Sequence, residues 1–185
     1  LSFSFHTKGG TGHSFTLRSS IVRPPYEMLG TTSTYVNRYM RQVGNPTLVP
    51  QTDYSFQYSL AYRSLFFQTG YEYDKNYIGI DYRTDDNDPV VTLCTWKNYT
   101  HRQTLHFLAG FRHKFGWYEP SLNIGFLQPF FTSIYKGGPI KSNKGTFSLD
   151  MNNGVDLPWN ISGNVEYRYT SGGSDLFMTL KPVNI

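Results

Sequence analysis

Charged and imidazole side chains are the groups in this sequence that could carry chemistry, and most lie in stretches where apolar and polar residues alternate. Glu72 and Asp74 stand two residues apart, so in a strand both carboxylates would point to the same side. Paired carboxylates can act as general acid and base, but any residues at i and i+2 share a strand face. We therefore expect no catalytic residue and no enzyme.

Motifs for metals and phosphates are also incomplete. The five histidines (His6, His13, His101, His106 and His113) share no metal-ligand spacing. The run TDDND at 84–88 offers acidic oxygens to a hard cation but lacks the calcium-loop pattern, so we interpret it as a solvated loop tip. The run KGGTG at 8–12 lacks the Lys-Ser/Thr of a phosphate loop and predicts a tight turn. We expect no metal and no cofactor.

Composition indicates a surface that does not face water alone. Aromatic residues make up 17% of the 185 residues and charged residues only 16%. No run approaches the length of about 18 apolar residues that a transmembrane helix needs, whereas strands of a membrane barrel alternate and average to a polar hydropathy. The formal charge of +4 is spread along the chain, which argues against nucleic acid as a partner. The single Cys94 excludes an internal disulfide.

The dominant pattern has a period of two residues, which predicts strands with one apolar and one polar face. The clearest example is YSFQYSLAY at 54–62, where aromatic and aliphatic residues alternate with serine, glutamine and alanine. Similar alternation occurs at 1–6, 13–22, 103–113 and 160–170. We predict about nine antiparallel strands, with unusually long ones at 65–83 and 89–112 that project past a membrane.

Connections between the predicted strands alternate in length. Short turns fall at 8–12, 63–64, 114–117 and 157–159, and longer segments at 24–53, 83–89, 133–145 and 171–174. Short turns at one end and long loops at the other are the plan of an outer-membrane barrel, whose apolar face meets lipid and whose polar face lines a wet interior. The fold prediction is an all-β, antiparallel, up-and-down transmembrane β-barrel. A soluble β-sandwich would show the same alternation.

The barrel prediction gives the charged residues a role, because side chains that line a lumen set its selectivity. The expected lumen-facing residues are Arg18, Glu72, Asp74, His106, Arg112, Glu166 and Arg168. The first long loop carries the candidate ligand-binding residues Tyr26, Tyr35, Tyr39 and Met40. Such side chains suit contact with a ligand or packing within the loop, and both interpretations remain open at this point.

The first long loop also carries a resemblance. An alternating strand ends at Arg23-Pro24, an aromatic-containing loop follows, and GNPTLVP at 44–50 leads into the next strand. In these elements, and through LDMNNGVDLPWNISGNVEYRY at 149–169, the chain resembles the barrel domain of TonB-dependent outer-membrane receptors, in the group labelled outer-membrane β-barrel family proteins. Gly30-Thr31 and Val49 depart from that group's pattern. Pro46 and Pro50 each lack an amide N–H, so a structural role for this segment is also expected.

The resemblance implies a barrel of about twenty-two strands, a plug, and a periplasmic segment that engages TonB. Residues 1–185 would then be a portion of a single β-barrel domain, without the plug or the TonB-interacting segment. The implied partners are outer-membrane lipid, the remainder of the receptor, TonB and a surface lipoprotein. The implied function is nutrient uptake across the outer membrane of a Gram-negative bacterium. The alternatives are a soluble β-sandwich that binds carbohydrate and a small stand-alone barrel of about eight strands.

Overall fold

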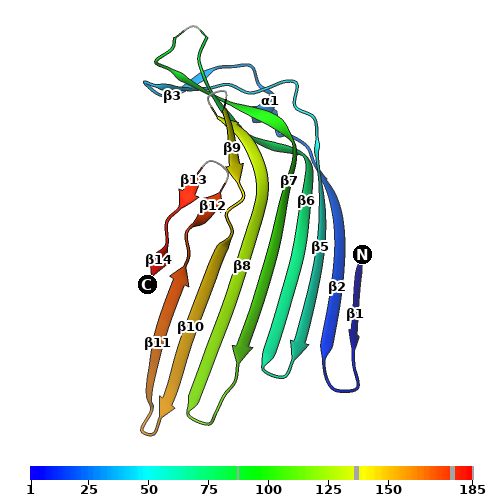
Figure 1. Cartoon of the computed structure of the whole chain (residues 1–185), viewed down its shortest axis with the longest axis vertical. Helices are drawn as coiled ribbons and strands as arrows, with labels where there is room; N and C mark the ends of the chain where they lie inside the picture. The colour runs from blue at the N-terminus through cyan, green and yellow to red at the C-terminus, as the bar shows by residue number, and fades with distance from the viewer. Residues whose placement is uncertain (87, 136–137, 176–177, 185) are drawn as a thin grey trace.

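The computed structural model describes residues 1–86, 88–135, 138–175 and 178–184, and most of them lie in one curved sheet (Figure 1). The long strands pair antiparallel with their neighbours in chain order. They are β1 (Ser2–His6), β2 (Gly12–Val22), β5 (Gln51–Tyr62), β6 (Leu65–Thr84), β7 (Thr92–Arg112), β8 (Tyr118–Tyr135), β10 (Thr146–Leu157) and β11 (Ile161–Thr170). The short β14 (Val183–Asn184) follows β11 at the edge. This order confirms the all-β, up-and-down prediction.

Among the described residues, no helix is long and apolar enough to cross a membrane.

The two ends of the sheet differ as the sequence predicted. All four short turns lie at one end and the long connections lie at the other (Figure 1). Each short turn contains residues with positive φ, namely Gly10, Arg63, Gly116, Trp159 and Asn160. Such residues reverse the chain within a few positions, which keeps the turns tight.

The strand register builds two continuous faces, because residues directly opposite each other in a ladder point to the same side. Phe15 lies opposite Tyr58, Phe107 opposite Phe126, and Phe126 opposite Phe147. We call this side the apolar face; the residues that alternate with it form the polar face. Phe107 and Phe126 are each 38% exposed, so no second layer among the described residues covers them. The sandwich alternative is therefore wrong.

Both edges of the sheet are open in the part of the chain that the structure describes. There, β1 pairs only with β2, and β14 pairs only with β11. A second, two-stranded sheet, β12 (Gly173–Asp175) with β13 (Met178–Leu180), forms in the segment between β11 and β14. The strands thus do not close into the small stand-alone barrel that was the other alternative.

Short elements within the long connections were not predicted. The first long loop contains a single helical turn, α1 (Tyr26–Leu29), and a hairpin of β3 (Thr34–Asn37) and β4 (Met40–Gln42). β9 (Gly138–Ser142) pairs with β8. These pieces are too short to show a period, and contacts with other elements stabilise them. β4, for example, runs parallel to β7, with Met40 opposite Thr92.

The hairpin of β6 and β7 exchanges neighbours halfway along its length. In its lower part, β6 pairs with β5 as far as Lys75, and β7 pairs with β8 as far as Gln103. In its upper part, β7 pairs with β4, and β6 contacts β8 at Tyr82. Asn76, with a φ of 54°, lies where the exchange occurs. We call strand parts 77–84 and 92–99 the outer hairpin; it bends over the top of the sheet (Figure 1).

Candidate functional site

All seven predicted lumen-facing residues lie on the polar face. The register places Arg18 opposite Ser55, and Ser55 opposite Glu72. Asp74 lies opposite Arg102. His106 lies opposite Leu127, and Arg112 lies opposite Ser121. Glu166 lies opposite Asn152, and Arg168 lies opposite Asp150. The sheet therefore brings the set together on one surface, and whether that surface lines a lumen remains a prediction.

Ion pairs join neighbouring strands along the polar face. Arg112 Nη2 lies 2.7 Å from Glu119 Oε1. Arg168 donates to Asp150 on β10 at 2.6 Å and to Glu166 on its own strand at 3.0 Å. All these charged groups keep contact with solvent, and exposed pairs contribute little to stability. They form a charged, hydrated wall.

Glycines give the large polar-face side chains room to lie flat. The imidazole of His106 lies over Gly70, where a Cβ would overlap the ring. Phe66 lies over Gly110 in the same way. His106 thus packs against the wall of the sheet with its ring fixed by the neighbouring strand.

Buried aromatic side chains gather at the base of the outer hairpin. Tyr77, Tyr99 and Phe131 form an aromatic cluster, with ring centres between 5.1 and 6.5 Å apart. The Tyr99 hydroxyl donates to the carbonyl oxygen of Ile80 at 3.0 Å. Burial, aided by the negative charge of Asp81, raises the pKa of Tyr99 to about 12. The outer hairpin is therefore anchored by packing and not only by its ladder.

The first long loop is docked on the outer hairpin by polar contacts. Asn45 Nδ2 donates to the Trp96 carbonyl oxygen at 2.9 Å. The Asn98 amide accepts from Val49 N at 2.9 Å and donates to the carbonyl oxygens of Val49 and Asn76. The GNPTLVP segment is thus held at both ends, which supports the structural role expected from its prolines.

The interpretation of TDDND as a solvated tip is wrong for Asp85. Its side chain is 5% exposed and lies 2.5 Å from Arg41 Nη2 on β4. Asp86 and Asp88 are exposed. The pair links β4 to the segment between β6 and β7, a contact that local sequence could not indicate because 44 positions separate Arg41 from Asp85.

The tyrosines of the first long loop are not packed within it. Tyr26 is 88% exposed, Tyr35 64% and Tyr39 56%, while Met40 is partly buried beside β7. The Arg38 guanidinium lies 5.7 Å from the centre of the Tyr39 ring. Their exposure excludes packing within the loop for these three rings. Contact with a ligand stays a prediction.

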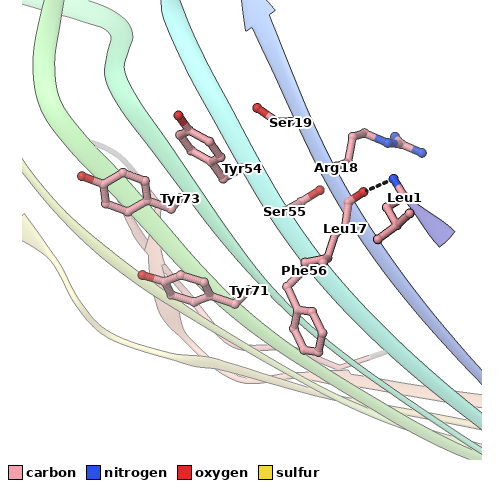
Figure 2. Close-up of a pocket in the computed structure, with 9 residues that line it drawn as sticks. All are labelled: Leu1, Leu17, Arg18, Ser19, Tyr54, Ser55, Phe56, Tyr71 and Tyr73. Carbon is pink, nitrogen blue, oxygen red and sulfur yellow. Dashed lines mark hydrogen bonds between the residues drawn. The ribbon is translucent and has the colours of Figure 1, made fainter. Parts of the chain in front are cut away.

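An apolar hollow of about 410 Å³ lies on the apolar face toward its upper end (Figure 2). Tyr54, Tyr71 and Tyr73 group on one side of it, and Arg18 extends away from them. The Tyr71 hydroxyl donates to Gln103 at 2.9 Å, and Tyr73 stacks on His101 with ring centres 5.7 Å apart. Rings with polar tips at one level are typical of the boundary between lipid and water.

In the described ranges, no group of three or more His, Cys, Asp or Glu side chains is placed to hold a metal ion. Sequence reasoning did miss Arg102, Arg41 and Asn98, which position the outer elements, whereas Asn45 lies in the GNPTLVP segment for which a structural role was expected. Only Arg102 had a detectable signal, since it shares the strand face of His106.

The sequence comparisons agree with this geometry. The chain matches the outer membrane protein beta-barrel family over residues 2–184. No curated protein matches it significantly. The family match spans nearly the whole sheet. It includes the apolar face, the short turns at one end and the long connections at the other. The chain therefore belongs to the outer membrane protein beta-barrel family, whose place is the Gram-negative outer membrane.

Proposed function

We propose that this chain forms part of the barrel wall of a TonB-dependent receptor that takes up a nutrient across the outer membrane. The observation that carries the proposal is the charged polar face directly behind the apolar face. A wall of this kind separates lipid from an aqueous passage. The resemblance of residues 23–50 to such receptors supports the finer assignment.

Further strands of the same receptor would complete the barrel. An open edge presents unpaired N–H and C=O groups, and each such group costs several kcal/mol in hydrocarbon. The free edge of β1, and the part of β11 that β14 does not cover, therefore favour pairing with additional strands on both sides. The other proposed partners are outer-membrane lipid, a plug linked to TonB, and a surface lipoprotein.

The wall would shape a passage and perform no chemistry. Arg18, Glu72 and the other polar-face charges would set which solutes pass. The exposed Tyr26, Tyr35 and Tyr39 would contact the ligand before it enters. The energy for uptake would arrive through the plug from TonB, so no catalytic residue is proposed.

A growth experiment tests the transport role. Cells lacking the receptor are compared with the parent strain on a panel of single limiting nutrients, each with and without TonB. We expect slower growth without the receptor on at least one nutrient, and no further loss when TonB is also removed. A receptor-dependent growth advantage that persists without TonB would contradict the proposal, as would equal growth of both strains on every nutrient.

A further inference from the structure

A polar cleft of about 690 Å³ lies between the first long loop and the outer hairpin. One wall is the segment 44–49, and the other consists of side chains from β6 and β7. Its volume is in the range of small-molecule sites. It lies at the long-loop end of the sheet, apart from the exposed tyrosines and from the hollow in Figure 2.

Both walls of the cleft are held in place without a ligand. Asn45 is bonded to Trp96, and Asn98 is bonded to Val49, so amide side chains connect the loop to the hairpin on two sides. Pro46 restricts the backbone of the loop wall between these contacts. A fixed cleft loses little entropy on binding a small molecule.

Three charged side chains line the cleft without an ion-pair partner. They are Asp81, Arg83 and Lys97, and none takes part in an ion pair within the described chain. The register sets Asp81 opposite Thr95, with Arg83 and Lys97 each two positions away on the same face. Lys97 Nζ also lies 5.9 Å from the centre of the buried Tyr99 ring, which steadies its position.

These charges select a class of ligand. Two cations beside one carboxylate leave an excess of positive charge, which attracts a carboxylate or phosphate group. The Asp81 carboxylate and the Thr47 and Thr95 hydroxyls suit hydroxyl groups on the same ligand. Trp96 also lines the cleft.

We propose that this cleft binds a small hydroxylated acid of the size of a hexuronic acid, with its carboxylate on Arg83 and Lys97 and its hydroxyls on Asp81. The inference rests on the proposed function, because such an acid would be the captured nutrient. Phosphate groups of lipopolysaccharide in the outer leaflet offer similar chemistry, so the test includes them as a separate arm.

Calorimetric titration of the purified full-length protein in detergent tests the cleft. The probes are glucuronate and glucose, which differ by the carboxylate, and lipopolysaccharide freed of its ester-linked acyl chains. We expect glucuronate to bind about tenfold more tightly than glucose, the factor for one charge-assisted hydrogen bond. Lys97→Gln and Arg83→Gln should each weaken glucuronate binding about tenfold. Lys97→Arg, which keeps the charge, should weaken it less.

The matched control is Lys75→Gln, which removes an exposed lysine from β6 outside the cleft and should leave binding unchanged. Heat-modifiable migration on gels shows that each variant is folded. Failure of the wild-type protein to bind glucuronate overturns the inference, as does equal binding of glucose. If the variants lose binding of lipopolysaccharide but not of glucuronate, the cleft binds lipopolysaccharide phosphates, and this result also overturns the inference. The titration needs no TonB, so its result does not depend on the growth experiment. Failure of the uptake proposal and failure of the cleft proposal can therefore be told apart.

Discussion

Arg102 on β7 donates to Asp74 Oδ2 on β6 from both Nε and Nη2, at 2.8 and 2.7 Å. Its guanidinium also lies 4.1 Å from the centre of the Tyr77 ring. This pair sits directly below the level where the β6–β7 hairpin exchanges neighbours. Asp74 is only 6% exposed, so its charge depends on Arg102 for compensation. The contact therefore connects the polar face to the outer hairpin.

Replacing Arg102 by glutamine should destabilise the protein, because it leaves a buried carboxylate without its cation. We expect the free energy of unfolding to fall by about 2–4 kcal/mol in urea titrations of the full-length protein in lipid vesicles. The matched control is Arg168→Gln, which breaks exposed pairs on the same face and should change stability little. Equal effects of the two substitutions would show that the Asp74 pair is not a special anchor.

Gly44 should not tolerate even alanine. A Cβ at this position would overlap the Gly30 and Met28 carbonyl oxygens, which are backbone atoms and cannot turn aside. We expect Gly44→Ala to cost about 1–3 kcal/mol and to expose the first long loop to proteases. Gly9→Ala is the control, since its new Cβ would meet only Thr7 Oγ1 at 3.9 Å. Unchanged protease sensitivity in Gly44→Ala would contradict the docked position of the loop.

Tyr99 should ionise only in strongly alkaline solution. Burial and the charge of Asp81 raise its pKa from 10.0 to about 12, so the folded state favours the neutral phenol. Its contribution to stability is complete below pH 10.0 and is lost as the pH rises toward about 12. The phenolate absorbance of the wild-type protein minus that of Tyr99→Phe should therefore rise near pH 12. A difference curve centred near pH 10 would mean that this ring is not buried.

The exposed tyrosines should matter for binding and not for folding. Tyr26→Ala and Tyr35→Ala remove rings that are 88% and 64% exposed, so we expect stability to change by less than about 0.5 kcal/mol. Leu48→Ala in the same loop is the contrast, because Leu48 is 8% exposed; it should cost about 2–3 kcal/mol. If Tyr26→Ala lowers stability as much as Leu48→Ala does, these rings pack within the loop after all.

The regular part of the fold could be predicted because each strand repeats its own signal. In β5, five apolar or aromatic residues alternate with polar ones, and the ladders carry that pattern into β2 and β6. Face assignment follows from parity alone, so Glu72 and Arg168 were placed on the same surface from sequence. Turn positions followed from glycine and polar residues between periodic segments.

The outer elements could not be predicted because long-range contacts decide them. β4 has three residues, and its partner is 52 positions away in β7. The partner of Asp85 is Arg41, 44 positions earlier in the chain, so the local run of acids could not predict its burial. The exchange of neighbours beside Asn76 changes which strands flank the upper part of the hairpin, and strand alternation does not reveal this.

Depth-dependent labelling tests most directly whether the apolar face meets hydrocarbon and the polar face meets water. Cys94, the single cysteine, is first replaced by serine, and a fluorescent label is then attached at Phe107→Cys or at His106→Cys. These neighbours on β7 point to opposite faces. In vesicles, brominated lipid chains should quench the label at position 107, and a water-soluble quencher should quench the label at position 106. Equal quenching at both positions, or the reverse pattern, would contradict a membrane wall.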